Sequence, residues 1–224
     1  MKVYNIAIDG PAGAGKSTIA KKIAKELSFI YIDTGSMYRA IAYYLLGQGI
    51  DTKDQDKVVK AIEHVNVTIE YKDGEQQVLL NGDNVTDKLR KEEVGTMASS
   101  VAKHEAVRTK MVDLQRELAK SSNVIMDGRD IGTVVLPSAD LKVFLTASSY
   151  VRAKRRYNEL SEKGISCNLE EIEKDIISRD TQDMTRLISP LKQAEDAILV
   201  DTSDMTIDEV VNFIINLFHK KINN

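Results

Sequence analysis

Residues 3–18 read Val-Tyr-Asn-Ile-Ala-Ile-Asp-Gly-Pro-Ala-Gly-Ala-Gly-Lys-Ser-Thr, and this stretch decides the fold. Its second half fills the spacing G-x-x-x-x-G-K-[ST] of a phosphate-binding P-loop with Gly10, Gly15, Lys16 and Ser17. The apolar run before the loop predicts a strand, and the helical spacing of apolar residues after it predicts a helix. This is the context in which a P-loop is expected.

The residue types in the loop suit the phosphates of a nucleoside triphosphate. Glycines let main-chain N–H groups approach an anion closely, and the dipole of the following helix adds attraction. We expect Lys16 to reach the β- and γ-phosphates of ATP and the Ser17 hydroxyl to bind Mg²⁺. The expected ATP-binding residues are Gly10, Pro11, Ala12, Gly13, Ala14, Gly15, Lys16, Ser17 and Thr18. The alternative, a glycine-rich turn that only connects two elements, leaves the order Gly-Lys-Ser-Thr without a use.

The composition excludes several functional classes. The chain has 224 residues, 42% of them hydrophobic, and its net charge of -3 argues against broad nucleic-acid binding. The single Cys167 excludes an intramolecular disulfide, and the three histidines are too scattered to suggest a metal cluster with it. Without an apolar run of roughly 18 residues or a signal-peptide pattern, we expect a cytoplasmic protein with no membrane partner. No feature demands an oligomer, so we expect a monomer.

Five apolar stretches, each followed by a helical pattern, predict the core of the fold. They lie near 3–8, 29–32, 123–126, 141–146 and 197–201. Strands that alternate with helices in this way form a parallel sheet with right-handed crossovers. The expected fold class is therefore α/β, a P-loop three-layer α/β/α domain with a five-stranded parallel sheet.

The stretch 51–92 departs from the pattern of single strands followed by helices and predicts an inserted β-rich subdomain. Two alternating patterns, 67–71 and 77–80, flank Asp73-Gly74, and Asp-Gly between such runs is a strong hairpin signal. Antiparallel hairpins do not belong inside a doubly wound parallel sheet, so we interpret this stretch as an insertion.

Further elements are expected around the core and the insertion. Helices are predicted over 54–65, over 92–120 with a break near Lys103-His104-Glu105, near 169–178, and from Thr206, whose capping box pairs it with Glu209, to about Lys221. Residues 81–84 are predicted to form a second turn, and Val85-Thr86 to open a short strand or helix.

Asp33-Thr34-Gly35 follows the second predicted strand and admits three interpretations. An aspartic protease presents a catalytic carboxylate in this way, but that chemistry needs two carboxylates that share a proton. The segment can also be a helix N-cap and nothing more. The favoured interpretation is a loop at the carboxyl end of a strand, where ligands bind in open α/β sheets.

Asp127-Gly128-Arg129-Asp130 ends another predicted strand and offers polar groups at the same sheet edge as the P-loop. A strand that ends in Asp is what P-loop enzymes use for the Mg²⁺ shell, so Asp127 is the candidate. Arg129 offers a guanidinium to a phosphate, and Asp130 offers a carboxylate to hydroxyl groups. The alternative is an internal Arg–Asp ion pair that closes a turn.

Two dense sets of charged residues, 152–156 and 179–186, lie on either side of a turn near Gly164. A basic run on a helix is by default a solvated face, and Arg108 has the same default interpretation on its residues alone. Two helices joined by a flexible turn, with arginines at both ends, instead predict a mobile lid.

Together these segments resemble the bacterial cytidylate kinases, enzymes of pyrimidine nucleotide metabolism. The resemblance rests on 10–18, on Asp33-Thr34-Gly35 with Tyr38-Arg39, on 127–133 and on 179–186, and it extends over the full chain. It implies a phosphotransferase that converts ATP and CMP or dCMP to ADP and CDP or dCDP with Mg²⁺. It also implies a single domain made of a core of residues 1–33, 121–150 and 190–224, an acceptor-binding region with the insertion at 34–120, and a lid at 151–189.

The resemblance further implies roles for individual residues. The acceptor nucleotide would be bound by Thr34, Tyr38, Arg39, Ser99, Arg108, Arg129, Asp130, Arg179, Asp183 and Arg186. Ser99 and Arg108 would bind the edge of the base, and Asp130 the sugar hydroxyls. Arg152, Arg155 and Arg156 resemble lid arginines, and the catalytic set would be Lys16, Arg129, Arg155, Arg156 and Arg179. Ser17 and Asp127 would hold the metal, directly or through water.

Two other functional classes stay open. Another P-loop kinase, of uridylate, adenylate or shikimate type, would share everything except the contacts to the base. A non-enzymatic regulator would bind ATP without turnover, which the 127–133 loop and the paired arginine sets disfavour.

Overall fold

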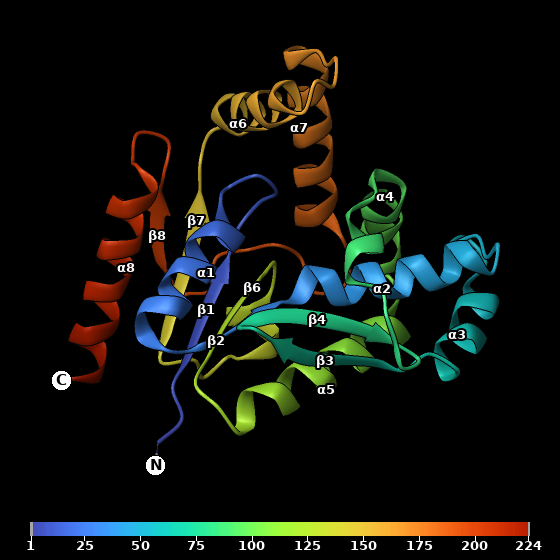
Figure 1. The fold of residues 1–224 in the computed structure, drawn as a ribbon, viewed down its shortest axis with the longest axis horizontal. Helices are drawn as coiled ribbons and strands as arrows, with labels where there is room; N and C mark the ends of the chain where they lie inside the picture. The colour runs from blue at the N-terminus through green and yellow to red at the C-terminus, as the bar shows by residue number, and fades with distance from the viewer. Residues whose placement is uncertain (1, 224) are drawn as a thin grey trace. The chain divides into compact units, whose positions relative to one another are not determined.

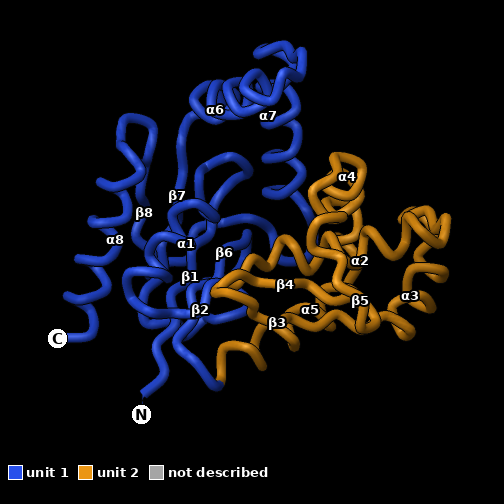
Figure 2. Tube along the Cα trace, viewed as in Figure 1, with its two compact units in different colours: residues 1–31, 121–224 blue, residues 32–120 orange. Residues whose placement is uncertain are grey.

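The structure is a computed structural model that describes residues 2–223, and the chain divides into two compact units. Unit 1 comprises residues 1–31 and 121–224, and unit 2 comprises the continuous segment 32–120 (Figure 2). The expected acceptor-binding region, 34–120, covers nearly the same residues as unit 2. Its role in binding an acceptor stays a prediction. None of the helices in residues 2–223 combines the length and apolar character that a membrane-spanning helix requires.

Unit 1 contains the P-loop and most of the parallel sheet (Figure 1). Its elements are β1 (Asn5–Asp9), α1 (Lys16–Leu27), the start of β2 (Ile30–Asp33), β6 (Val124–Gly128), a π-helical turn (Ile131–Val135), β7 (Leu141–Thr146), α6 (Ser149–Glu162), α7 (Leu169–Thr185), β8 (Ile198–Asp201) and α8 (Ile207–Ile222). The π-helical turn was not expected from the sequence.

The five-stranded sheet has the order β2-β6-β1-β7-β8, with β1 at its centre. β1 pairs in parallel with β6, in a register that sets Asp9 opposite Gly128, and with β7 on its other side. The predicted parallel α/β fold is therefore confirmed. The middle of the central strand, Ile6-Ala7-Ile8, is apolar because both faces of the strand are covered, as parallel sheets require.

The core of unit 1 lies between the sheet and the helices α1 and α8, which pack together in Figure 1. Ile19 and Ile23 of α1 and Ile214 of α8 meet strand residues such as Ile6 and Ile8 there. The predicted capping box of α8 is present, with reciprocal hydrogen bonds between its first residues. This packing fixes the start of α1, and so the P-loop, against the carboxyl end of the sheet.

α7 is longer than the sequence predicted. The pattern indicated a helix near 169–178 followed by an arginine-rich segment, whereas the helix runs to Thr185 and carries Arg179 and Asp183 on its last turns. Asn168 caps its start by accepting hydrogen bonds from two backbone N–H groups, and no glycine or proline interrupts the chain before Pro190. The segment therefore extends α7 instead of following it.

Unit 2 combines helices with the inserted sheet. Its elements are the end of β2, α2 (Thr34–Gly47), α3 (Gln55–Glu63), β3 (Val67–Lys72), β4 (Glu75–Leu80), β5 (Asp83–Asn84), a 3-10 helix (Thr86–Arg90), α4 (Glu92–Val101) and α5 (Glu105–Lys120). The break near 103–105 is confirmed. The predicted turn at 81–84 is partly wrong, because its last two residues pair with β4 as β5.

The predicted hairpin between β3 and β4 is confirmed, with Val67 opposite Leu80 and Lys72 opposite Glu75. Asp73 and Gly74 have φ of 54° and 79°, the left-handed values that a two-residue hairpin loop needs at both positions. The turn chemistry therefore sets the register of the inserted sheet.

Candidate active site

The P-loop connects β1 to α1 through three glycines with positive φ. At Gly10, where φ is 150°, a Cβ atom would lie 1.9 Å from the carbonyl oxygen of Leu145, so the loop can begin only with glycine. Gly15 is the N-cap of α1, and the helix starts at Lys16. The loop opens onto a helix N-terminus as the motif predicted, which directs backbone N–H groups and the helix dipole at the same point.

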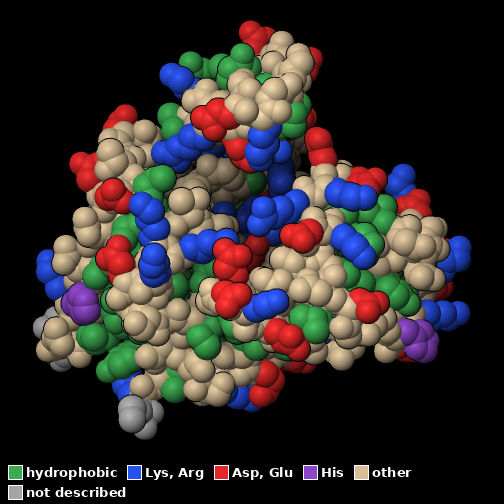
Figure 3. All heavy atoms as spheres, in the orientation of Figure 1, with side chains coloured by type: hydrophobic (Ala, Val, Ile, Leu, Met, Phe, Trp, Pro, Cys, Tyr) green, Lys and Arg blue, Asp and Glu red, His purple; other side chains and the backbone are tan. Residues whose placement is uncertain are grey.

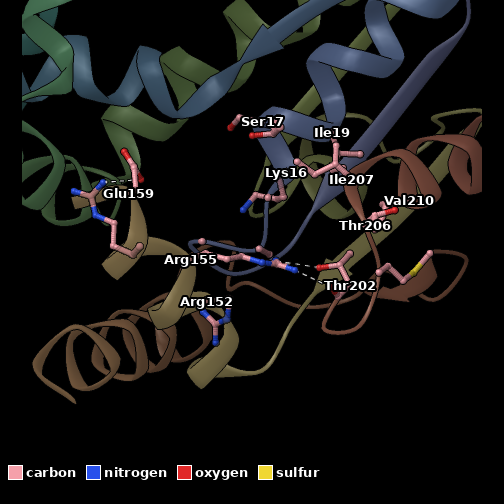
Figure 4. A pocket seen from close by; sticks show the side chains of 16 residues that line it. Lys16, Ser17, Ile19, Arg152, Arg155, Glu159, Thr202, Thr206, Ile207 and Val210 are labelled. Carbon is pink, nitrogen blue, oxygen red and sulfur yellow. Dashed lines mark hydrogen bonds and ion pairs between the residues drawn. The ribbon is translucent and has the colours of Figure 1, made fainter. Parts of the chain in front are cut away.

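A cavity of about 510 Å³ lies beside the P-loop within unit 1. This volume falls in the range of pockets that hold a nucleotide-sized ligand. Its lining comprises 13–19 of the P-loop and α1, four residues of α6, and Thr202, Met205, Thr206, Ile207 and Val210 around the start of α8 (Figure 4). The cavity thus joins a phosphate-binding end to an end with apolar side chains, as a nucleotide requires.

Lys16 is buried, and its Nζ donates a hydrogen bond to the Pro11 carbonyl oxygen at 2.7 Å. Burial, followed by the positive charge of Arg129, lowers the pKa of Lys16 to about 7. The carboxylates of Asp127, Asp9 and Asp183 act in the opposite direction. The surroundings of Lys16 therefore disfavour its charged form, and a phosphate group next to the amine would favour that form again.

Ser17, Asp127 and Tyr31 form one hydrogen-bonded group next to Lys16. The Ser17 hydroxyl donates to Oδ2 of Asp127 and the Tyr31 hydroxyl donates to Oδ1, each at 2.8 Å. The structure thus brings the two predicted metal ligands together. A carboxylate and a hydroxyl are the oxygen donors that Mg²⁺ prefers, so the residues present fit this ion. Tyr31 has no signal in the sequence motif and was missed.

Asp9 joins β1 to the turn that follows β6. Its buried carboxylate accepts hydrogen bonds from the backbone N–H groups of Ile131 and Gly132, at 2.8 and 2.7 Å. Burial raises the pKa of Asp9 to about 6, although both hydrogen bonds act to lower it. Sequence reading gave this residue no role.

Four residues expected to bind the acceptor meet in unit 1. Arg129 donates from Nε to Oδ2 of Asp183 at 2.8 Å. Arg186 has one guanidinium nitrogen 3.8 Å from Asp130 and another 3.9 Å from Asp183. These contacts do not support the alternative interpretation, in which Arg129 and Asp130 pair with each other and close the turn. Their partners are instead Asp183 of α7 and Arg186, which follows α7.

The expected lid arginines differ from one another. Arg152 is buried and donates to the carbonyl oxygens of Ala147 and Ala12 and, at 2.6 Å, to Asp180 of α7. It therefore ties α6 to both the P-loop and α7. Lys and Arg side chains gather along α6 and α7 in Figure 3, with some acidic ones among them.

The other two arginines expected to belong to a lid have looser surroundings. Arg155 donates to the carbonyl oxygen of Thr202 at 2.7 Å, across the cavity wall seen in Figure 4. Arg156 is half exposed and pairs with Glu159. Arg179 is exposed on α7. Of the predicted catalytic arginines, Arg155 and Arg156 line the cavity.

Unit 2 carries the other residues expected to bind the acceptor. Asp33 caps α2 by accepting from the Ser36 N–H, and it forms an ion pair with Arg39 at 2.9 Å. The N-cap interpretation is thus correct in part. A protease would need a second carboxylate at this point, whereas the partner is a guanidinium. Thr34 is buried at the first position of α2.

Gln76 of β4 contacts the same loop of unit 2 and was missed. Its side-chain oxygen accepts from the Asp33 N–H at 2.8 Å, and its side-chain nitrogen donates to the Ser36 hydroxyl at 2.7 Å. The inserted sheet therefore supports the start of α2.

Arg108 is buried, so its interpretation as a solvated helix face is wrong. Its guanidinium lies 5.6 Å from the centre of the Tyr38 ring, and it donates to the Ala102 carbonyl oxygen. Ser99 is half-buried on α4. A buried arginine stacked on an aromatic ring is an arrangement that ligand sites use.

A family model described as cytidylate kinase matches residues 6–220. The chain belongs to the cytidylate kinase family. It is 50% identical to a cytidylate kinase of Caldicellulosiruptor saccharolyticus, over 100% of this chain and 99% of the relative, and 52% identical to that of Shouchella clausii, over 96% of each. The enzyme is thus a phosphotransferase of the nucleoside monophosphate kinase class.

Solved structures support the fold of this kinase. It resembles a gluconokinase of Sinorhizobium meliloti with a TM-score of 0.52 and 13% identity, over 97% of this chain and 92% of the other. At that identity the likeness concerns the arrangement of strands and helices. It agrees with the P-loop α/β architecture described above.

Proposed function

We propose that the enzyme transfers the γ-phosphoryl group of ATP to CMP and dCMP, giving ADP and CDP or dCDP, with Mg²⁺. The observation that carries the proposal is the ion-pair cluster of Arg129, Asp130, Asp183 and Arg186, which lies in the same unit as the P-loop. These are positions where the family pattern implies an acceptor nucleotide. The cavity beside Lys16 supports a nucleotide donor.

Transfer would depend on alignment and on charge neutralisation by the residues of this chain. The acceptor phosphate is already anionic near neutral pH, since the second pKa of a phosphate monoester is about 6, so no general base is needed. Lys16, Arg129, Arg155, Arg156 and Arg179 are proposed to offset charge on the transferred group. One arginine can be worth about 10³ to 10⁵ in rate at a phosphoryl transition state.

The metal and the acceptor would each use a defined set of side chains. Ser17 and Asp127 would hold Mg²⁺, directly or through water, where the ion would neutralise phosphate charge. The proposed acceptor contacts in unit 2 are Thr34, Tyr38, Arg39, Ser99 and Arg108, and in unit 1 Arg129, Asp130, Arg179, Asp183 and Arg186. All of them belong to one chain, so we propose that a monomer is active. We also propose that the enzyme has no nucleic-acid partner.

A panel of acceptors in a coupled ADP assay tests the proposal. CMP and dCMP should be phosphorylated, whereas AMP, shikimate and buffer alone should give background ADP. Turnover with AMP or shikimate but not with CMP would assign the enzyme to another acceptor class. ATP binding without turnover of any acceptor would contradict an enzymatic role.

One pair of variants links the panel to the proposed base contact. Arg108→Met should raise the KM for CMP by at least about tenfold while the KM for ATP stays nearly constant, because a hydrogen-bonded charged group is lost only at the acceptor. Arg116→Met is the matched control, since Arg116 lies exposed two turns along the same helix. Equal effects of the two variants on the KM for CMP would refute the placement of Arg108.

A further inference from the structure

Asp9 occupies a junction between two parts of the site. It is the last residue of β1 and directly precedes Gly10, the first glycine of the P-loop. Its side chain is 5% exposed, and both of its oxygens accept backbone N–H groups from Ile131 and Gly132. These two residues begin the π-helical turn that follows Arg129 and Asp130.

The hydrogen bonds of Asp9 replace a cap that the turn does not supply itself. The first N–H groups of any helical turn have no partner within the turn and need an acceptor when they are buried. Asp130 stands at the N-cap position, where an Asp side chain ordinarily accepts them, but it makes no such bond. Asp9, more than 100 residues away in the sequence, provides both acceptors instead.

Because Asp9 accepts these N–H groups, the Asp130 side chain is available for another contact. Its carboxylate is not engaged in capping, and one of its oxygens lies 3.8 Å from a nitrogen of Arg186. The cap from Asp9 therefore lets the residue at the N-cap position turn to another partner. Because its pKa is raised only to about 6, the Asp9 carboxyl group is ionised at neutral pH, so both oxygens can accept.

We propose that Asp9 is a positioning residue that holds Arg129, Asp130 and the turn after them in a fixed place relative to the P-loop. The inference rests on the proposed function, in which the P-loop binds the donor and Arg129 and Asp130 bind the acceptor. In-line transfer needs the two phosphates aligned, and a misplacement of about 1 Å can cost roughly 100-fold in rate. Two short charge-assisted hydrogen bonds to a buried carboxylate are a rigid connection.

The two hydrogen bonds from Ile131 and Gly132 to Asp9, here called the clamp, lie in a tightly packed region, which supports a precise role. A Cβ atom at Gly132 would lie 3.4 Å from Oδ2 of Asp9 and 3.1 Å from Cδ of Lys142. Lys142 is itself buried and paired with Asp196, so it has little freedom to move aside. A methyl group at 132 would therefore crowd the Lys142 side chain and come into contact with the carboxylate of Asp9.

Asp9→Asn in the full-length enzyme tests the proposal. The asparagine keeps the size of the side chain but turns an NH₂ group toward one of the two N–H donors, so one hydrogen bond is lost. We expect kcat to fall by about tenfold or more and the acceptor KM to rise by a similar factor. The dissociation constant of a non-hydrolysable ATP analogue should change by less than about threefold, because the donor contacts themselves are intact.

Asp140→Asn is the matched control. Asp140 accepts the Asn5 N–H at 2.9 Å, so it is a carboxylate that binds the backbone of the same strand at its opposite end. This variant should lose some thermal stability while kcat and both KM values stay near those of the wild type. If it reproduces the kinetic losses of Asp9→Asn, the effect is general destabilisation of β1 and the proposal fails.

Gly132→Ala gives an independent test, and it decides the matter if Asp9→Asn does not fold. It leaves Asp9 in place and adds one methyl group against the clamp, so acceptor KM should rise more than the dissociation constant of the ATP analogue. Unchanged acceptor KM and kcat in whichever variants fold would overturn the role of Asp9. So would a loss of ATP-analogue binding as large as the loss of acceptor binding.

The proposed function and the role of Asp9 fail in distinguishable ways. Failure of the wild type to phosphorylate CMP refutes the proposed function alone. The role of Asp9 is tested by comparing kcat and the acceptor KM of the variant with those of the wild type. Both are measured with the panel compound that the wild type phosphorylates fastest.

Discussion

Binding of ATP at pH 8 is expected to take up close to one proton, and Lys16 is the group that should receive it. This amine is buried beside Arg129, and its pKa is lowered to about 7. The phosphates of ATP would add negative charge next to the amine and restore its pKa toward the ordinary range near 10.4. Nucleotide binding and protonation of Lys16 are therefore linked.

The size of the uptake follows from that pKa. An amine with a pKa of about 7 is about 90% neutral at pH 8, about 50% neutral at pH 7 and about 10% neutral at pH 6. If the bound form is fully charged, uptake should be about 0.9, 0.5 and 0.1 protons at these three pH values. At pH 8 the nucleotide phosphates are already deprotonated, so they contribute little.

Isothermal titration calorimetry measures this number directly. A non-hydrolysable ATP analogue is titrated at one pH in buffers that differ in ionisation enthalpy, and the slope of observed enthalpy against that quantity is the proton count. Lys16→Met should abolish the uptake. Lys142→Met should not, because this second buried lysine pairs with Asp196 outside the cavity lining. An uptake below about 0.3 protons at pH 8, or equal uptake in Lys16→Met, would refute the reasoning.

Three further predictions concern buried charge. Asp127→Asn should raise the Mg²⁺ concentration for half-maximal rate by about tenfold or more, because a charged oxygen ligand is lost. Tyr31→Phe should shift that concentration far less. A magnesium titration of initial rates measures both. Arg152→Met should cost about 3 to 5 kcal/mol of unfolding free energy in urea, because it leaves its buried carboxylate partner uncompensated, while the half-exposed Arg156→Met should cost less than about 1 kcal/mol. The folded-state pKa of Asp9, about 6, is above its ordinary 3.8, so folding favours its protonated form. The stability of the wild type relative to Asp9→Asn should therefore be greatest below pH 3.8 and fall by at most about 3 kcal/mol as the pH rises through 6. Identical pH profiles of the two proteins in urea melts would contradict this.

Local patterns were sufficient for the elements whose cause is local. The apolar run of β1, the glycines of the P-loop, Asp73-Gly74 in the hairpin and the capping box of α8 each act within a few residues, and each is present in the structure. The end of α7 was missed because nothing in the chain marks it. No glycine or proline follows Ser178 within the helix, and Arg179, which suggested a separate segment, is a good helix former.

Residues whose partners are distant in sequence could not be assigned from pattern. Asp9 meets a turn more than 100 residues later, and Tyr31 of β2 meets Asp127 of the neighbouring strand β6. Arg152 looked like a lid cation but is held by two carbonyl oxygens and a carboxylate. The assignment of acceptor contacts such as Arg108 came from family resemblance, since a basic residue on a helix is ordinarily solvated.

The order of strands in the sheet also has a consequence for synthesis on the ribosome. β1 is made well before its two neighbours in the sheet, β6 and β7, which begin at residues 124 and 141. At bacterial or eukaryotic elongation rates the nascent β1 waits on the order of ten seconds for a partner. The whole of unit 2 is a continuous segment made in that interval, so it is free to fold first. The nucleotide-binding loop, although made before the whole of unit 2, would then be among the last parts of the nascent enzyme to become ordered.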